Sequence, residues 1–221
     1  KSINFMAKHG RGLICLALTK KQVDNLKLPL MSSINKSRMQ TAFTVSIEAK
    51  KGISTGISAY DRAKTIKVAI SKNSKKKDLV SPGHVFPLVA RAGGVLERAG
   101  HTEASVDISK LSKLNPSAVI CEVMNEDGRM ARLKDLQKFS AKHKIKIASI
   151  EDLIAYRLEN EKLISKLSTK SFNTRKKGKY EYIIYENKLN KSKNFVIKKG
   201  KFNSNKSIRV RVVSTKLNNS K

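Results

Sequence analysis

The sequence predicts an α+β fold: a three-layer domain built on a mixed β-sheet with flanking helices, followed by a small truncated β-rich segment. Apolar runs suited to buried strands alternate with amphipathic helical patterns through residue 167, as in layered domains. Beyond that point, strand-like pieces separated by polar turns replace the helices. Hydrophobic residues form 39% of the 221 residues, which is enough for a substantial core. We therefore expect a first domain over residues 1–167 and a partial second domain over residues 168–221.

The first elements follow from short patterns. NFMAKHGRG (4–12) is typical of the last turns of a helix, with Gly10 or Gly12 available for a left-handed cap. LICLALT (13–19) suits a buried strand, and TAFTVSIEA (41–49) has the period-two alternation of another. The polar, irregular segment between these two strands is long enough to be a functional loop.

The remaining elements are predicted from the same two periods. Ser58 and Asp61 have the spacing of a capping box, which opens a helix over 58–70. Beyond residue 105, the patterns of the first domain predict a helix over 106–115, a buried strand over 116–124 and a turn over 125–130. An amphipathic helix over 131–144 and a strand over 144–150 follow. The last element is a long helix over 149–167, which Ser149 and Asp152 can cap. The tail reads as a basic linker over 168–180 and strands over 180–187, 193–202 and 207–217.

Composition excludes several classes of protein. The sequence has no apolar run of about 18 residues, so we expect no membrane span. Its basic first residues lack the apolar centre and small-residue cleavage site of a signal peptide. Cys15 and Cys121 are too few and too isolated for a disulfide framework or a zinc site, so both are expected to be reduced thiols. We therefore expect a cytoplasmic protein.

The formal net charge of +30 is the strongest compositional signal. Clustered Lys and Arg neutralise phosphates, so such a charge favours a nucleic-acid partner when it is concentrated. Here it is dispersed: residues 159–221 hold 18 basic and 4 acidic residues, and the rest of the excess is spread thinly over the first 158 positions. Because charge runs are more often solvated faces, nucleic acid is not the partner that we expect.

The stretch SPGHVFPLVARAGGVLERAGHTEASVD (81–107) gathers ionisable groups. His84 and His101 each follow a glycine, in the company of two arginines, two glutamates and an aspartate. On spacing alone, such a histidine is more often a turn or cap residue than a ligand. Glu122 is the stronger candidate, because a carboxylate at the end of an apolar strand must find a partner or a function. A structural salt bridge remains the alternative interpretation of Glu122.

Together these residues resemble the 3,4-dihydroxy-2-butanone 4-phosphate synthase family. The matching pieces occur in the same order over residues 5–158: HGRGLICLALT, FTVSIEA, GISTGISAYDRAKTI, the stretch 81–107, AVICEVMNEDGRMAR and IASIEDLIAYR. An ordered set of this kind is more specific than any single motif. The tail resembles, more faintly, the opening strands of the GTP cyclohydrolase II domain that follows this enzyme in bifunctional riboflavin proteins.

The resemblance implies a lyase that converts D-ribulose 5-phosphate into 3,4-dihydroxy-2-butanone 4-phosphate and formate in riboflavin biosynthesis. It implies that His101 is a ligand of Mg²⁺ or Mn²⁺, and that His84 and Glu122 are catalytic acid–base groups. Substrate contacts are implied for a further set of residues: Arg98, Gly100, Thr102, Asp61, Arg62, Thr65 and Cys15.

Two further expectations come with the family. Its members are homodimers in which one histidine, here His84, enters the active site from the neighbouring subunit. The family's acidic loop, which supplies a glutamate metal ligand, is expected upstream of the matched region. We therefore expect a fragment of a longer product that is weakly active or inactive alone. An inactive remnant and a basic nucleic-acid-binding protein that retains the enzyme fold stay open as alternatives.

Overall fold

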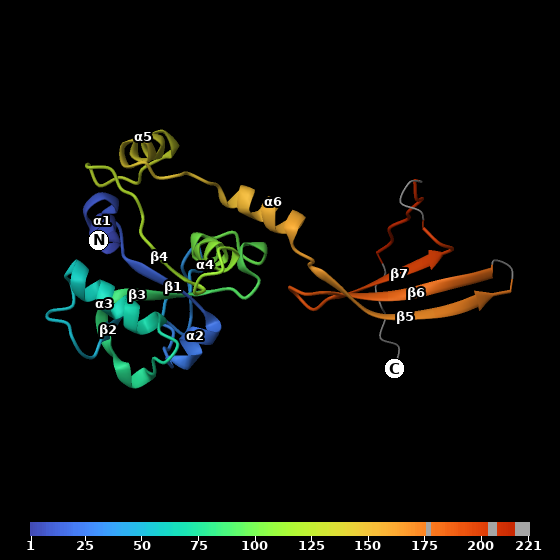
Figure 1. Ribbon diagram of the computed structural model, residues 1–221, viewed down its shortest axis with the longest axis horizontal. Helices are drawn as coiled ribbons and strands as arrows, with labels where there is room; N and C mark the ends of the chain where they lie inside the picture. The colour runs from blue at the N-terminus through green and yellow to red at the C-terminus, as the bar shows by residue number, and fades with distance from the viewer. Residues whose placement is uncertain (176–177, 203–206, 215–221) are drawn as a thin grey trace. The chain divides into compact units, whose positions relative to one another are not determined.

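The computed structural model describes residues 1–175, 178–202 and 207–214. The chain divides into two compact units, Lys1–Glu161 and Lys162–Lys221. In Figure 1 the first unit carries the labels α1 to α6 and β1 to β4, and the second carries β5 to β7. The division falls before residue 167 because strand β5, Ile164–Thr174, pairs with strand β6, Gly178–Asn187. Residues 164–167 are thus held by the second unit.

The first unit is built on a four-stranded mixed sheet with the order β2-β3-β1-β4. Its central strands are parallel to each other, and both edge strands run antiparallel to their neighbours. The strands are β1 (Cys15–Thr19), β2 (Ile47–Ala49), β3 (Leu79–Ala90) and β4 (Ser117–Ile120). This arrangement confirms the predicted mixed sheet.

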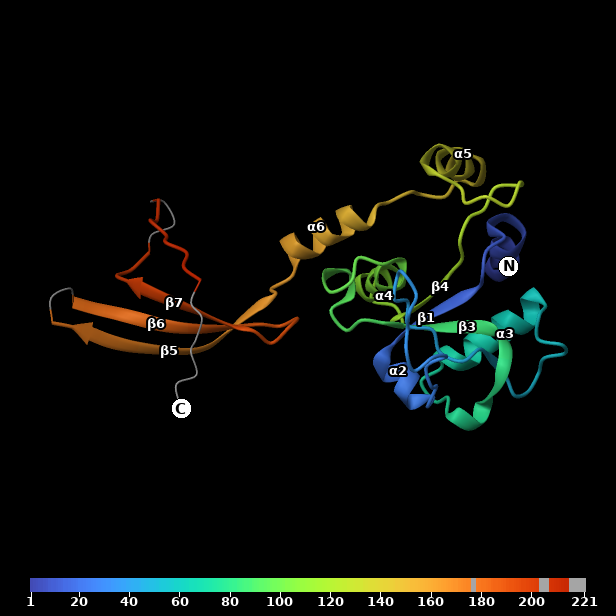
Figure 2. The ribbon, with the colours of Figure 1, turned by 180° about the vertical axis from the view of Figure 1, so that it is seen from behind.

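Helices cover both faces of this sheet. The apolar run of β1 alternates between the faces. Leu16 and Leu18 belong to the main core with side chains from α2 (Lys20–Asn25) and α3 (Ala59–Ile70), whereas Ala17 packs with Val106 of α4 (His101–Leu111). Figure 2 accordingly shows α4 and α2 on opposite sides of β1 and β3. The predicted three-layer architecture is therefore confirmed, with β1 buried on both faces as its continuous apolar sequence requires.

Short capping contacts fix where the helices begin. The Ser58 hydroxyl accepts a hydrogen bond from the Asp61 amide at 3.0 Å, and Ser149 does the same for Asp152 at 3.0 Å. Both predicted caps are therefore present. The helical segments of the first unit are α1 (Ser2–Phe5), η1 (Met6–Gly10), α2 (Lys20–Asn25), α3 (Ala59–Ile70), η2 (Lys76–Asp78), η3 (Gly94–Leu96), α4 (His101–Leu111), α5 (Leu133–His143) and α6 (Ile150–Asn160). Among the described residues, no helix has the length and apolar character needed to cross a membrane.

Several predicted elements are wrong in extent or type. The cap after η1 is Arg11, with φ 69°, rather than a glycine, and its side chain bonds the Met124 carbonyl at 3.1 Å. The predicted strand over 144–150 is irregular, because Ile145 and Ile147 stay largely exposed and find no strand to pair with among the described residues. The long helix expected to reach residue 167 stops at Asn160.

The second unit is a three-stranded antiparallel sheet with the order β5-β6-β7. Its third strand is β7, Lys193–Lys199. The predicted linker over 168–180 is instead largely strand β5, because its backbone pairs with β6. Stacked rings, Phe172 on Tyr180 and Tyr182 on Phe195, reinforce the pairing. Of the strand predicted over 207–217, residues 207–214 are not in a strand, and the rest lies outside the described residues.

Candidate active site

The N-terminal end of α4 holds a compact group of predicted site residues. Gly100 is the residue before the helix, and a Cβ there would lie 2.7 Å from a Glu103 carboxylate oxygen and closer still to the Arg98 guanidinium. The position therefore excludes a side chain. This close approach lets the guanidinium lie directly against the first turn of the helix.

Arg98 is held by three contacts. Its Nη1 donates to Glu103 at 2.5 Å, and its Nη2 donates to the Met39 carbonyl at 2.8 Å and to the Thr41 hydroxyl at 3.2 Å. Arg98 also lines a hollow of about 310 Å³ together with Arg38 of the long loop before β2. A guanidinium pair at a surface hollow is suited to forked contacts with a phosphate or carboxylate.

His101 and Thr102 are adjacent but differently placed. His101 is the first residue of α4 and is exposed, whereas Thr102 is buried. Among the described residues, no three His, Cys, Asp or Glu side chains gather into a metal-binding cluster. The neighbouring Glu103 is already engaged by Arg98 and by the Arg91 amide. Because Mg²⁺ prefers several oxygen ligands, the described residues alone do not complete a magnesium site around His101.

Glu122 and Cys15 lie at the other end of the sheet from α4's first turn. Glu122 follows β4, and its Oε2 accepts a hydrogen bond from the Leu13 amide at 2.9 Å. Gly12 makes this approach possible, because a Cβ there would lie only 2.6 Å from the same oxygen. The ladder pairs Cys15 with both Phe86 and Ile120. His84 precedes Phe86 by two residues and Glu122 follows Ile120 by two, so both lie near the Cys15 end of the sheet.

The electrostatics of this end differ from those of a reactive-thiol site. Burial raises the pKa of the Cys15 thiol to about 12, with further contributions from Glu122 and Cys121. The pKa of Cys121 is also raised, chiefly by burial, and the positive charge of Arg62 opposes that increase. Among the described residues, the Nε of Arg62 is a buried donor that finds no hydrogen-bond acceptor. Cys15 is thus a neutral lining group, and Arg62 is a cation with unused hydrogen-bonding capacity.

Asp61 and Thr65 are buried, and their side-chain oxygens form hydrogen bonds within the protein. The Asp61 carboxylate accepts bonds from the Ser54 hydroxyl at 2.8 Å and from the Ser54 and Gly56 amides. The Ser54 hydroxyl and these amides hold the Asp61 pKa below its ordinary value. The Thr65 hydroxyl accepts from the Ala49 amide at 3.0 Å, which ties α3 to β2. Asp61 therefore fixes the loop that precedes α3, and Thr65 fixes the helix against β2.

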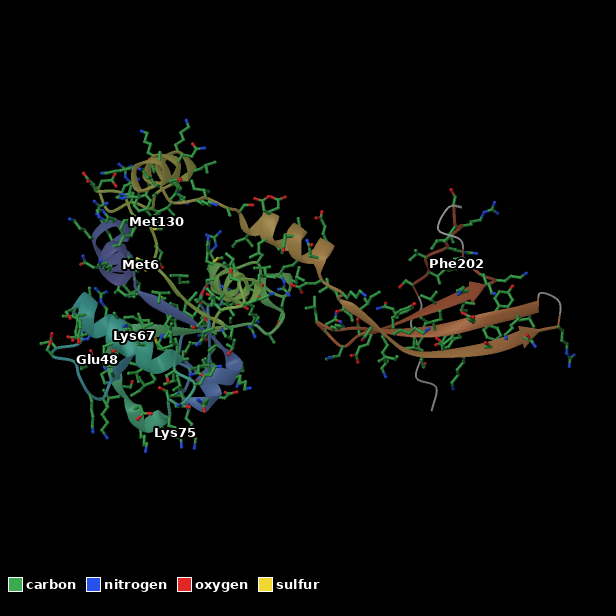
Figure 3. All side chains as sticks on the ribbon, in the orientation of Figure 1. Met6, Glu48, Lys67, Lys75, Met130 and Phe202 are labelled. Carbon is green, nitrogen blue, oxygen red and sulfur yellow. The ribbon has the colours of Figure 1, made fainter. Side chains whose placement is uncertain are left out.

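His84 lies on β3 and is hydrogen-bonded through Nδ1 to the Glu48 carboxylate. Glu48 comes from β2, the strand beside α3, and is labelled in Figure 3. The His84 ring is 43% exposed and the Glu48 side chain 15%, so the carboxylate is packed while the ring reaches solvent. The Nδ1 atom of the imidazole is therefore held by Glu48, while part of the ring remains accessible to solvent.

The candidate residues form two groups at opposite ends of the sheet. His84 and Ala90 are both in β3, and the path of six residues between them spans roughly 20 Å. The α4 group is tied to the Ala90 end, because Glu103 accepts a hydrogen bond from the Arg91 amide at 3.0 Å. Within one chain, His84 is thus not brought together with His101, whereas it shares its end of the sheet with Glu122.

Sequence reasoning missed three residues of these groups: Arg38, Glu48 and Glu103. Glu103 carried a usable signal, since it stands two residues after His101 in a helical pattern and is buried at 1% exposure against Arg98. Arg38 lies in an irregular loop, where no periodic pattern indicates a neighbour. The partner of Glu48 is determined by strand register, which the sequence does not state.

Comparisons with known proteins identify the family of the chain. Residues 1–156 match the model of the family described as 3,4-dihydroxy-2-butanone 4-phosphate synthase. The chain is 50% identical over 216 residues to the riboflavin biosynthesis protein RibBA of Aquifex aeolicus, covering 97% of this chain and 53% of that protein. It is 46% identical to a 3,4-dihydroxy-2-butanone 4-phosphate synthase of Photobacterium phosphoreum, covering 96% of this chain and 58% of the relative. The chain thus spans little more than half the length of these curated relatives.

Solved structures give the same result. A two-domain 3,4-dihydroxy-2-butanone 4-phosphate synthase from A. baumannii, RibBX, matches with a TM-score of 0.78 and 44% identity, covering 90% of this chain and 58% of that one. A 3,4-dihydroxy-2-butanone 4-phosphate synthase in complex with two magnesium ions matches with a TM-score of 0.67 and 38% identity, covering 72% of this chain and 79% of that one. With its four-stranded mixed sheet and the order of its motifs, the chain therefore belongs to the 3,4-dihydroxy-2-butanone 4-phosphate synthase family.

Proposed function

We propose that the protein containing this chain is a lyase of riboflavin biosynthesis that converts D-ribulose 5-phosphate into 3,4-dihydroxy-2-butanone 4-phosphate and formate. The observation that carries the proposal is the family match over residues 1–156, which includes every residue assigned to the site. We place the reaction in the cytoplasm. The second unit is proposed to be the first part of a GTP cyclohydrolase II-like domain.

The end of α4 is the proposed phosphate-binding region. Arg98 is anchored by Glu103, so its guanidinium is held in place before a ligand arrives. The hollow that it lines with Arg38 opens beside Ala99 and Gln40. A sugar phosphate docked there presents its carbon chain towards Gly100, His101 and Thr102. Forked guanidinium contacts supply both charge and orientation for such a ligand.

Glu122 and His84 are the proposed proton-moving groups. Glu122 keeps one carboxylate oxygen on the Leu13 amide and leaves the remainder exposed, so it is oriented and still accessible. The His84 ring, which is anchored at Nδ1 and partly exposed, is the proposed partner of Glu122 in proton transfer. Arg62, whose positive charge acts on Cys121, is proposed to add a cation to this end of the sheet. Enediol formation and loss of a hydroxyl both require such paired acid and base groups.

The metal is proposed to be Mg²⁺ or Mn²⁺ with His101 as one ligand. Among the described residues of one chain, no group of three His, Cys, Asp or Glu side chains gathers, so we propose that further carboxylate ligands complete the site beside His101. Such an ion, where bound, polarises neighbouring oxygens of a sugar. We accordingly expect this chain alone to be weakly active or inactive, and we expect formate release by the full-length protein to stop with a chelator and to return with Mg²⁺.

A homodimer is proposed because His84 and His101 lie at opposite ends of the sheet in one chain. Joining the Glu122 end of one subunit to the α4 end of another unites all the assigned residues in each of two equivalent sites. His84→Ala and His101→Ala homodimers are then both inactive. Because a two-fold heterodimer of the two variants has one intact site, mixing them at equal amounts restores about a quarter of the wild-type rate.

Formate release by the full-length protein measures this outcome. Unfolding and refolding the variants together allows subunits to exchange, and each variant refolded with itself is the control. Absence of any recovery, with heterodimers demonstrated by mass, would rule out a site shared between subunits. Absence of formate from the wild-type protein supplied with ribulose 5-phosphate and Mg²⁺ would rule out the proposed function itself.

A further inference from the structure

The contact between Glu48 and His84 is built by an irregularity in the sheet. Strand β2 pairs Ile47 with Val85, but the next pair along is Glu48 with Val80. Residues 81–84 are therefore left out of the ladder as an extended bulge. Bulges bend a strand and re-aim its side chains, and they are frequent beside active sites. Here the bulge carries His84 out over the edge strand and turns its ring onto Glu48.

Glycines leave the space that the Glu48 carboxylate occupies. A Cβ on Gly83 would collide with the Ile47 backbone and lie within contact of the Glu48 side chain. A Cβ on Gly56 would coincide with the Glu48 carboxylate, and Gly56 also has φ +88°, which L side chains rarely adopt. The Gly83 amide donates to the Ser46 hydroxyl at 3.1 Å, which fixes the bulge against β2. Gly56 thus leaves room for the carboxylate of Glu48, and Gly83 leaves room for the stem of the same side chain.

An exposed ion pair is the simplest alternative, and such pairs usually contribute little. Three features distinguish this contact from a surface pair. The Glu48 side chain is 15% exposed, the bulge specifically displaces His84 towards it, and the glycines leave room for its carboxylate. A carboxylate that accepts the Nδ1–H of a histidine fixes both the orientation of the ring and the nitrogen that carries the proton.

We propose that Glu48 is a positioning residue that holds His84 in the Nδ1–H tautomer, so that the Nε2 lone pair faces open space as a proton acceptor. This assignment rests on the proposed function for its catalytic consequence, because His84 is the group that moves the proton. When Nε2 takes a proton, the carboxylate faces an imidazolium and stabilises it. No proton leaves Nδ1 in the step.

The tautomer is measured directly by ¹⁵N NMR of His84 at a pH where the ring is neutral, with the His84→Ala spectrum identifying its signals. In the wild-type chain we expect a protonated Nδ1 and an unprotonated Nε2. In Glu48→Gln, whose amide can donate as well as accept, we expect that preference to be lost. Glu159→Gln, which makes the same change at an exposed position of α6, is expected to leave the His84 signals unaltered.

Kinetics of the full-length protein then test the consequence. Glu48→Gln is expected to lower kcat by about 10²-fold with KM within about twofold, and Glu48→Asp to recover part of the loss because it restores the carboxylate. Thermal unfolding of each variant checks that the fold is kept. The assignment is overturned if His84 has the same tautomer in the wild type and in Glu48→Gln, whatever the rates. Failure of the wild type to release formate contradicts the proposed function and leaves the NMR comparison to decide the tautomer.

Discussion

The Glu122 carboxylate accepts one hydrogen bond, from the Leu13 amide, and the rest of the side chain is exposed. Asp61 is the opposite case, because it is buried and both of its oxygens accept hydrogen bonds from Ser54 and Gly56. The two carboxylates were predicted for the same site, yet their contacts differ in kind. Glu122 is available for chemistry, whereas Asp61 is committed to the loop before α3.

Replacing Glu122 by Gln is therefore expected to remove activity without unfolding the protein. The amide oxygen can still accept from the Leu13 amide, so the loop after β4 keeps its anchor. Loss of the basic carboxylate is expected to lower kcat by roughly 10²- to 10⁴-fold. Steady-state formate release by the full-length protein gives the rate, and circular dichroism checks the fold. A variant with more than half of the wild-type kcat would remove Glu122 from the proton-transfer role.

Cys15 gives a prediction about alkaline pH. Its folded-state pKa of about 12 lies above the ordinary thiol value, mainly because the thiol is buried. Between those two values the unfolded chain loses the Cys15 proton while the folded chain keeps it. Stability is thus fully present below the unfolded pKa and falls as pH rises towards the folded one, by up to about 1.4 kcal/mol per pH unit from this group.

Urea denaturation of the wild type and of Cys15→Ala from pH 8 to 11 isolates this contribution, since the many lysines titrate in both proteins. The wild type is expected to lose stability more steeply above pH 9 than the variant does. Parallel curves would show that the thiol is solvated. Slow alkylation of Cys15 in the folded chain, against rapid alkylation in urea, provides the independent check.

At the scale of elements, the sequence predicted those parts whose pattern is local. The apolar run of β1 and the Ser58 and Ser149 caps are visible within a few residues, and each is present. Strand β3 has no counterpart among the predicted strands, because Pro82, Gly83 and Pro87 interrupt its pattern. Its ladder is held by β1 and β2, which lie far away along the chain.

The candidate site shows the same limit. His84, His101 and Glu122 were found through the family's motifs, but their division between two ends of the sheet was not. That division depends on β1 and β3 being parallel and on α4 beginning at the Ala90 end. The direction and register of strand pairing depend on long-range packing, so a local sequence pattern does not predict either.

Helix α6 is joined to α4 by a buried ion pair. Arg157 donates to Asp107 at 2.7 Å and to the Gly93 carbonyl at 2.9 Å, and Asp107 also accepts from the Val95 amide at 2.8 Å. The two side chains are 10% and 4% exposed. Arg157 also donates to the Glu161 carboxylate, from Nε at 2.6 Å and from Nη2 at 2.8 Å. Removing the Asp107 charge therefore takes away the most buried partner of Arg157 and leaves it the half-buried one.

Asp107→Asn is therefore expected to lower the free energy of unfolding by about 2 kcal/mol, because a buried hydrogen bond between charged groups is lost while Glu161 still pairs with Arg157. The Asn side chain can still accept from the Val95 amide. Asp24→Asn is the matched control, because it breaks the exposed Lys20–Asp24 pair, whose side chains are 67% and 58% exposed. That change is expected to cost less than about 1 kcal/mol. Urea denaturation measures both, and equal losses would show that burial of the Arg157 pair has no effect.

At the scale of the whole molecule, the net charge of +30 acts independently of the site. A dispersed positive charge attracts polyanions through counterion release, without recognising a sequence. It does not by itself indicate a nucleic-acid function. Affinity that is equal for unrelated duplexes is the expected signature of such an attraction.

Duplex binding is accordingly expected at low salt and lost between about 50 and 200 mM, with equal affinity for unrelated sequences. Fluorescence anisotropy of two labelled duplexes across a salt series measures this. A sequence preference of tenfold or more at 150 mM salt would favour the alternative of a dedicated nucleic-acid-binding protein, and the proposed lyase would then need a second role.

Strand β1 is synthesised well before the two strands that pair with it. Cys15 pairs on one side with Phe86 and on the other with Ile120, so the apolar residues 13–19 leave the ribosome long before either partner does. Contacts between residues so far apart in the sequence form slowly, because closing the long loop between them costs conformational entropy. Until residue 120 has emerged, this apolar stretch lacks its native strand partners, so we expect nascent chains to aggregate unless a holdase chaperone covers residues 13–19.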